Sequence, residues 1–205
     1  MNRILVLGTR NAKKRREIEE ILGDLGLTLH DLSHYRAAPE VVEDGATFEA
    51  NARKKAAETA RSVGQWVLGE DSGLVVPALN GRPGVHSARY AGTQGDDAAN
   101  NTRLLAELAP LGPEAHAAYY VCTAALADPA GAIHAVVEGR CHGRIINAYR
   151  GEGGFGYDPL FLIPEYHRTF GELSPRVKHA LSHRGRALLR LRPVLRQLLG
   201  GEAKA

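Results

Sequence analysis

The sequence has few cysteines and no long apolar segment, and these absences exclude several classes of protein. Its 205 residues include only two cysteines, Cys122 and Cys141, which cannot alone form a disulfide framework or a four-ligand zinc site. No run of 18 apolar residues occurs, which argues against a membrane span. The apolar stretch in the first 14 residues, MNRILVLGTRNAKK, is too short for a signal peptide. We therefore expect a protein of the reducing cytoplasm.

The charges are close to balanced, and their positions carry more information than their sum. Hydrophobic residues make up 44% of the chain and charged residues 24%, with a net charge of +3, which is typical of a globular domain rather than a disordered chain. Five basic residues lie within 10–16, and seven Lys or Arg with no acid lie within 176–196. Two basic clusters favour an anionic partner, either a polyphosphate ligand or nucleic acid.

Hydrophobic periodicity predicts an α/β fold. Short apolar runs predict strands over 4–7, 66–68, 74–76, 117–126, 133–146 and 160–163. Spacings of three and four predict helices over 18–25, 47–63 and 97–108, a helix that begins after Ser174, and a last helix over 187–198. Helices alternate with strands early in the chain and strands are consecutive in the middle, so we predict a mixed sheet.

The segment after the first predicted strand combines a helix start with several cations. Thr9, Arg10, Asn11, Ala12, Lys13 and Lys14 occupy it. A helix N-terminus carries a partial positive charge, so cations there repel it unless an anion binds. The segment is therefore either a phosphate site or a solvated basic helix start. It is not a P-loop, because no G-x-x-x-x-G-K-[ST] pattern occurs.

Two adjacent acids, Glu70 and Asp71, follow the predicted strand over 66–68. Neighbouring side chains on a strand point to opposite faces, but a turn at Ser72-Gly73 would aim both into one cleft. Carboxylates at a strand end can bind Mg²⁺ together with substrate phosphates, and the alternative is a plain polar turn. Ser72 does not lie in a G-x-S-x-G nucleophile pattern. Glu43 is a further carboxylate, either a ligand or a solvated loop acid.

A glycine-rich loop over 151–159 contains two aromatic residues, Phe155 and Tyr157. Two interpretations are open. One of the two rings stacks on a nucleobase, or the loop is a turn in which both rings face the core. Downstream, Lys178, His183 and Arg184 carry hydrogen-bond donors suited to a base carbonyl or a phosphate, although His183 alone is as typical of an ordinary surface. Together these groups supply phosphate-binding cations, metal-binding acids and a base platform, which is the set that nucleotide hydrolysis requires.

At this point the motifs resemble those of the Ham1-like, or inosine triphosphate pyrophosphatase, family. The resemblance covers residues 9–188 and rests on six motifs in the family's order. They are Thr9-x-Asn11-x-x-Lys14, Glu43-x-Gly45-x-Thr47-Phe48-x-x-Asn51-Ala52, Asp71-Ser72-Gly73-Leu74, Gly81-x-Pro83-Gly84-Val85-x-Ser87-Ala88-Arg89-Tyr90, Gly154-Phe155-Gly156-Tyr157-Asp158-Pro159 and Ser182-His183-Arg184-Gly185.

The resemblance implies a single domain over 1–205 with an elongated fold, in which a long central mixed sheet lies between two lobes around a cleft. It implies hydrolysis of ITP, dITP and XTP to the monophosphate and pyrophosphate, with Mg²⁺ as cofactor, by a homodimer that binds neither nucleic acid nor a membrane. Asp71 matches the catalytic acid, and Glu43, Glu70 and Asp71 match metal ligands. The implied substrate contacts are Thr9, Arg10, Asn11, Ala12, Lys13, Lys14, Ser72, Phe155, Gly156, Tyr157, Asp158, Lys178, His183 and Arg184.

The sequence departs from the family pattern at two positions. Glu70 stands where the family commonly has Asp, so its carboxylate is one methylene farther from the backbone. Ala50 stands where the family commonly has Glu, which removes a capping box with Thr47. Two other functions compete with the predicted one. They are a related metal-dependent nucleotide pyrophosphatase with another base preference, and a non-catalytic nucleic-acid-binding module that uses the basic residues of 176–196.

Overall fold

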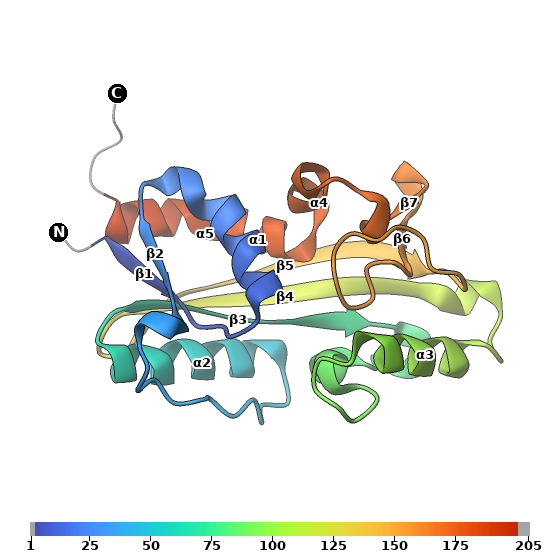
Figure 1. Ribbon diagram of the computed structural model, residues 1–205, viewed down its shortest axis with the longest axis horizontal. Coiled ribbons are helices and arrows are strands. Elements are labelled where there is room, and N and C mark those ends of the chain that lie inside the picture. The colour runs from blue at the N-terminus through green and yellow to red at the C-terminus, as the bar shows by residue number, and fades with distance from the viewer. Residues whose placement is uncertain (1–2, 201–205) are drawn as a thin grey trace. The chain divides into compact units, whose positions relative to one another are not determined.

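The fold is a mixed α/β arrangement built on a seven-stranded sheet (Figure 1). A computed structural model describes residues 3–200. The strands are β1 (Ile4–Leu7), β2 (Thr28–Asp31), β3 (Trp66–Val75), β4 (Ala117–Ala127), β5 (Ile133–Ile145), β6 (Phe161–Ile163) and β7 (Arg168–Thr169). The helices are α1 (Ala12–Leu22), α2 (Phe48–Val63), α3 (Asp97–Leu108), α4 (Pro175–Leu181) and α5 (His183–Leu199).

The strand order is β2-β1-β3-β4-β5-β6-β7. β1 pairs in parallel with both β2 and β3, whereas β6 pairs antiparallel with both β5 and β7. The described chain divides into two compact units. Among the described residues, unit 1 comprises 3–71, 122–139 and 184–200, and unit 2 comprises 72–121 and 140–183. β3, β4 and β5 each contribute residues to both units.

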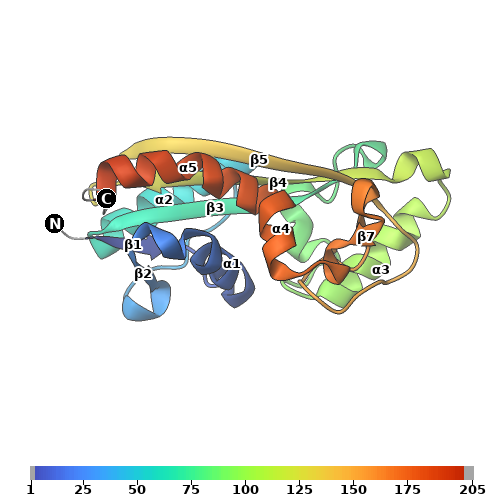
Figure 2. The same ribbon diagram turned by 90° about the horizontal axis from the view of Figure 1, so that it is seen from above.

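In unit 1, helices cover both faces of the strands. Leucines and isoleucines of β1, α1 and α5 form one buried cluster, which includes Leu7, Ile18 and Leu191. The other face packs Val6 and Val67 against the alanines of α2. In Figure 2, α1 and α5 accordingly lie on the viewer's side of β1 and β3, and α2 lies behind them. Because side chains alternate along a strand, each residue of β3 in this unit faces either α1 and α5 or α2.

Gly69 sets how closely α2 approaches β3. A Cβ at this position would lie 2.5 Å from the backbone nitrogen of Ala56 and 2.6 Å from the carbonyl oxygen of Ala52. Only glycine leaves room for this contact, and the small side chains of Ala52 and Ala56 on the helix serve the same close packing. The result is that α2 lies directly beside the strand segment that carries Glu70 and Asp71.

Unit 2 has a core of its own, rich in aromatic residues. Leu104 and Leu108 of α3 are buried in it together with Tyr120, Phe161 and Phe170. The Tyr120 ring lies edge-on to Phe161, with 4.7 Å between ring centroids, and is stacked near Phe170 at 5.9 Å. This core holds α3 beside the loop that precedes β6, where the Gly156 carbonyl accepts from the Asn101 side chain.

Most predicted elements are confirmed, and the mixed α/β class with them. The helix predicted over 97–108 has those bounds, and Thr47 caps α2 by accepting a hydrogen bond from the Ala50 amide at 3.1 Å. The strands predicted separately over 66–68 and 74–76 are one strand, because β3 continues without interruption to Val75 and no turn forms at Ser72-Gly73. The first helix ends at Leu22 rather than Leu25, where a short 3-10 turn follows. Within residues 3–200, no helix is both long enough and apolar enough to cross a membrane.

Candidate active site

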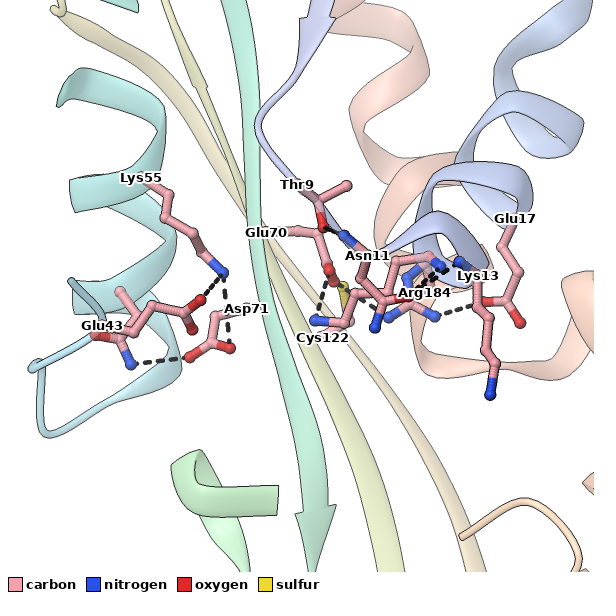
Figure 3. Close-up of polar contacts among 12 residues, drawn as sticks. Thr9, Asn11, Lys13, Glu17, Glu43, Lys55, Glu70, Asp71, Cys122 and Arg184 are labelled. Atoms are coloured by element: carbon pink, nitrogen blue, oxygen red, sulfur yellow. Dashed lines mark hydrogen bonds and ion pairs between the residues drawn. The ribbon is translucent and has the colours of Figure 1, made fainter. Parts of the chain in front are cut away.

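Glu70 and Asp71 point to opposite sides of β3 (Figure 3). Their directions follow from the alternation along the strand, because Glu70 has the parity of Leu68, which faces α1 and α5, and Asp71 has the parity of Val67, which faces α2. Both carboxylates are buried, with 1% and 4% of their residue surface exposed. The two acids therefore belong to two different polar clusters, one on each face of the strand.

The cluster around Asp71 is assembled by α2. The Asn51 amide nitrogen donates to Asp71 Oδ2 at 2.9 Å, and the Lys55 ammonium lies 4.0 Å from Asp71 Oδ1. The same ammonium is 3.0 Å from Glu43 Oε1, so Lys55 lies between two carboxylates, as Figure 3 shows. Asn51 and Lys55 are four residues apart on a helix and hence share one face. The side-chain oxygen Oδ1 of Asn51 also accepts a hydrogen bond from the Gly45 backbone amide at 2.8 Å, and this bond joins the loop that carries Glu43 to α2.

Burial raises the pKa of Asp71 above its usual value, and the charge of Glu43 adds to this effect. Lys55, Lys14 and the Asn51 hydrogen bond act in the opposite direction without cancelling it. A carboxylate with a raised pKa is a stronger base when ionised than an ordinary aspartate. The cluster thus provides a buried, oriented carboxylate that is able to accept a proton.

The cluster around Glu70 is a network of buried charges. Lys14 Nζ lies 2.8 Å from Glu70 Oε1, Arg184 Nη2 lies 3.3 Å from Oε2, and the Cys122 thiol donates to Oε2 at 3.3 Å. Arg184 also pairs with Glu17 of α1. Burial acts to raise the pKa of Glu70, but Arg184 and Lys14 outweigh it and hold that pKa well below its usual range. Glu70 therefore stays ionised and joins α1, β3 and α5.

The basic segment before α1 forms a capped helix start. Asn11 is the N-cap, and its side chain accepts hydrogen bonds from the Lys13 and Lys14 amides at 2.9 and 3.1 Å. Thr9 Oγ1 accepts from the Asn11 amide at 3.2 Å, and Arg10 donates to the Ala38 carbonyl at 2.9 Å. The first turn of α1, which begins at Ala12, contains no acid. The dipole and the exposed Lys13 side chain leave a positive potential at this end of the helix.

The predicted metal ligands are not brought together as one set. Glu43 and Asp71 share the Lys55 ammonium, whereas Glu70 lies on the other face of β3 with Lys14 and Arg184. Among residues 3–200, no three His, Cys, Asp or Glu side chains are grouped so that they could hold a metal ion. Mg²⁺ needs only one or two carboxylates when substrate phosphates complete its shell. Two carboxylates already arranged around a cation fit that requirement.

In unit 2, Asp158 links Phe155 to Lys178. Asp158 Oδ2 accepts from the Phe155 amide at 2.8 Å and from Lys178 Nζ at 2.7 Å. The Lys178 ammonium lies 5.0 Å from the centroid of the Phe155 ring, within the range of a cation–π contact. Phe155 is half-buried, so part of its ring is accessible, and its neighbour Gly156 has a left-handed φ of 63°. These residues form one connected group that carries an aromatic surface.

The remaining predicted residues have other surroundings. Tyr157 is buried in the core of unit 2, and its hydroxyl donates to the Ser87 carbonyl at 2.9 Å, so of the two aromatic residues only Phe155 offers a surface for stacking. His183 is buried and stacks on Tyr120 with 4.6 Å between ring centroids. Ser72 is half-buried on β3. Arg184 is 1% exposed and pairs with Glu17 and Glu70.

Sequence reasoning assigned no role to four residues of these clusters, namely Asn51, Lys55, Glu17 and Cys122. A signal for the first two is present in the sequence. Asn51 and Lys55 occur on the alanine-rich face of α2, where a polar pair with helical spacing is out of place unless it meets polar partners. Nothing comparable marks Glu17 or Cys122, because their partners are 167 and 52 residues away in the chain.

The fold and these clusters define an α/β protein with a buried general-base candidate beside a lysine and with cations at a helix start. The Ham1 family profile matches residues 5–194. The chain therefore belongs to the Ham1 family.

Individual relatives are similar over nearly the whole chain. A dITP/XTP pyrophosphatase of Rhodopirellula baltica is 54% identical over 97% of each chain. Among solved structures, a HAM1 protein from Coxiella burnetii is 38% identical, with a TM-score of 0.86 over 95% of this chain and 98% of that one. A nucleoside-triphosphatase / dITP/XTP pyrophosphatase from Mycobacterium abscessus is 44% identical, with a TM-score of 0.75 over 94% and 100%.

Proposed function

We propose that this protein hydrolyses the non-canonical purine nucleoside triphosphates ITP, dITP and XTP to the monophosphate and pyrophosphate, and so removes them from the nucleotide pool. The observation that carries the proposal is the buried Asp71 carboxylate, which has a raised pKa and is oriented by Asn51. Curated relatives that are 44 to 54% identical and carry the name dITP/XTP pyrophosphatase support it.

In the proposed mechanism, Asp71 accepts a proton from the water that attacks the α-phosphorus. Asn51 orients the carboxylate by donating to Oδ2, and the Lys55 ammonium keeps a positive charge 4.0 Å from Oδ1. Lys13 and the start of α1 bind the departing pyrophosphate, because their positive potential stabilises the charge that develops on it. Lys14 is half-buried beside Glu70, and it contributes its charge from there.

Members of the family are metal-dependent enzymes, and we propose Mg²⁺ as the metal. Glu43 and Asp71 are the residues that would hold it, since their carboxylates both lie near Lys55 Nζ and supply the one or two protein ligands that Mg²⁺ needs beside substrate phosphates. When bound, the ion supplies charge neutralisation at the phosphoryl oxygens. Glu70 keeps a separate task in this proposal, which is to hold Lys14 and Arg184 within unit 1.

For the base, we propose that Phe155 stacks on the purine and that Lys178 and Asp158 support it. Hypoxanthine and xanthine carry a 6-oxo acceptor where adenine carries an amino donor, so a donor at that edge discriminates between them. The proposal assigns this donor to His183, because Arg184 is engaged by two carboxylates. That the phosphate-binding and base-binding residues serve one nucleotide in one cleft stays a prediction, as does the homodimer. The cytoplasm is the location we propose, because its reducing conditions preserve the buried thiols of Cys122 and Cys141.

A nucleotide panel tests the proposed function. The full-length protein with Mg²⁺ is expected to release pyrophosphate from ITP, dITP and XTP at least about 100-fold faster than from ATP, GTP or pyrimidine triphosphates. EDTA in excess is expected to abolish the release, and added Mg²⁺ to restore it. Preference for a pyrimidine triphosphate would favour a related hydrolase. Salt-dependent binding of DNA or RNA without hydrolysis would favour a nucleic-acid-binding module.

A further inference from the structure

Helix α3 holds Gly156, the residue that follows Phe155, at two points. The Gly156 amide donates to Asp97 Oδ2 at 2.9 Å, and the Asn101 side-chain nitrogen donates to the Gly156 carbonyl at 3.0 Å. Asp97 and Asn101 are four residues apart in α3 and so lie on one face of it. Figure 2 lets the reader follow the loop between β5 and β6 past this helix.

These contacts fix the backbone on both sides of the Phe155 side chain. The amide before its ring donates to Asp158, and the amide after it donates to Asp97. The segment from Gly151 to Gly156 contains four glycines, three of them at positive φ, and a segment with this composition has many accessible conformations. Without attachments to the core, the Phe155 ring would sample many positions.

Asn101 has no evident reason to be in α3 other than this contact. It is 3% exposed, and asparagine is a poor helix former whose burial costs free energy unless it is hydrogen-bonded. A leucine at this position would extend the apolar face that Leu104 and Leu108 provide. The contact explains why an asparagine is at this position, because the backbone carbonyl of Gly156 needs a hydrogen-bond donor and the Asn101 side chain supplies one.

We propose that Asp97 and Asn101 are positioning residues for the base of the nucleotide, which they serve by holding Phe155 in the orientation that stacks on the purine. The inference rests on the proposed function, in which Phe155 provides the stacking surface. Neither residue needs to touch the substrate. Their loss is expected to weaken binding of the base end while the phosphate end and the chemistry stay intact.

Asn100 offers a matched control in the same helix. It is also buried, at 2% exposure, and it uses both ends of its amide, whereas only the nitrogen of the Asn101 amide makes a hydrogen bond within the described residues. The Asn100 oxygen accepts from the Ala91 amide at 2.7 Å, and its nitrogen donates to the Ala88 carbonyl at 3.3 Å. Replacement of either asparagine by aspartate removes one buried donor, but only Asn101→Asp touches the loop that carries Phe155.

The kinetic test compares Asn101→Asp with Asn100→Asp in the full-length protein with Mg²⁺. Asn101→Asp is expected to raise KM for dITP about 10-fold with kcat changed less than about 2-fold, which corresponds to one lost buried hydrogen bond. Inhibition by inorganic tripolyphosphate, which has no base, is expected to be unchanged. Asn100→Asp is expected to leave KM within about 2-fold. Equal KM shifts in both variants, or equally weakened tripolyphosphate inhibition, would overturn the proposal.

Hydrogen exchange tests the same contact without any substrate. Asn101→Asp and Asp97→Ala are expected to speed exchange of the amides in 151–158 by about 10-fold or more. Asp97→Asn keeps an acceptor and is expected to restore slow exchange. Unchanged exchange in both disrupting variants contradicts the proposal. If Asn101→Asp does not fold, Asn101→Ala replaces it. Wild-type protein that fails to hydrolyse dITP would refute the proposed function, whereas exchange would still decide whether the loop is held.

Discussion

Asp71→Asn is expected to reduce kcat for dITP by about 10² to 10⁴-fold, the usual contribution of a positioned general base. The substitution keeps the size of the side chain and an oxygen that accepts from Asn51 at the position where Asp71 Oδ2 does. It removes the group that takes the proton from water. The measurement is single-turnover pyrophosphate release at saturating dITP, with the melting temperature recorded in parallel.

The pH dependence of kcat in the wild-type enzyme is a second test of Asp71 as the general base. Only the ionised carboxylate accepts a proton, so kcat is expected to be low where Asp71 is protonated and to rise as the pH passes its pKa. Burial raises that pKa in the metal-free protein, and Mg²⁺ bound to Asp71 would lower it, so the rise is expected to move to lower pH as the Mg²⁺ concentration increases. The residual activity of Asp71→Asn is expected to lack this rise.

Asp44→Asn is the matched control for the loss of an acid in unit 1. Asp44 is exposed and pairs with Lys54 at 2.7 Å on the surface of the protein. An exposed ion pair contributes little to stability, and this one contacts neither Asp71 nor Lys55. Its kcat is expected to match the wild type. An Asp71→Asn enzyme that keeps more than half of the wild-type kcat would remove Asp71 from the role of base.

Arg184→Met is expected to lower the free energy of unfolding by about 3–5 kcal/mol, the cost of leaving buried charges without their partner. Arg184 is 1% exposed and neutralises both Glu17 and Glu70. Methionine retains much of the volume of the side chain but leaves two buried carboxylates with Lys14 as the remaining cation beside Glu70. Chemical denaturation at neutral pH measures the loss.

Two further variants separate lost charge from lost packing. Arg196→Met removes an exposed arginine from the same helix and is expected to change the free energy of unfolding by less than about 0.5 kcal/mol. Adding Glu70→Gln to Arg184→Met removes one of the two buried carboxylates that have lost their arginine partner, and it is expected to recover part of the lost free energy of unfolding. An Arg184→Met protein as stable as Arg196→Met would contradict the assigned role of the network.

The sequence predicted the elements well where local signals are strong, and it failed where tertiary pairing decides. The helix over 97–108 and the cap at Thr47 depend on periodicity and on one hydroxyl, and both are confirmed. The separate strands predicted over 66–68 and 74–76 left Ser72-Gly73 open to a turn, because these residue types are common in turns. In the fold these residues continue a strand, because tertiary context overrides local propensity. β2 has four residues, as β1 has, but only one of them, Leu29, is apolar, and β7 has two polar residues, so neither strand contains an apolar run.

The same holds for the site residues: local motifs predicted some of them, and contacts between distant parts of the chain determine the others. The sequence identified Asp71, Phe155, Asp158 and Lys178, and the structure brings the last three together in one group. The predicted grouping of Glu70 with Asp71 depended on the turn, and without the turn the alternation of the strand separates them. Arg184 resembled a ligand contact because its motif is polar, but its partners come from 114 and 167 residues away, which no local pattern reveals.

Hydrolysis of dITP in water enriched in oxygen-18 tests the central claim most directly, because it reports which phosphorus the water attacks. If the residues around Asp71 direct water to the α-phosphorus, the heavy oxygen is expected in the nucleoside monophosphate, and the pyrophosphate is expected to be unlabelled. Mass spectrometry of the separated products measures this. Label in pyrophosphate or in orthophosphate, or a diphosphate product, would contradict the account.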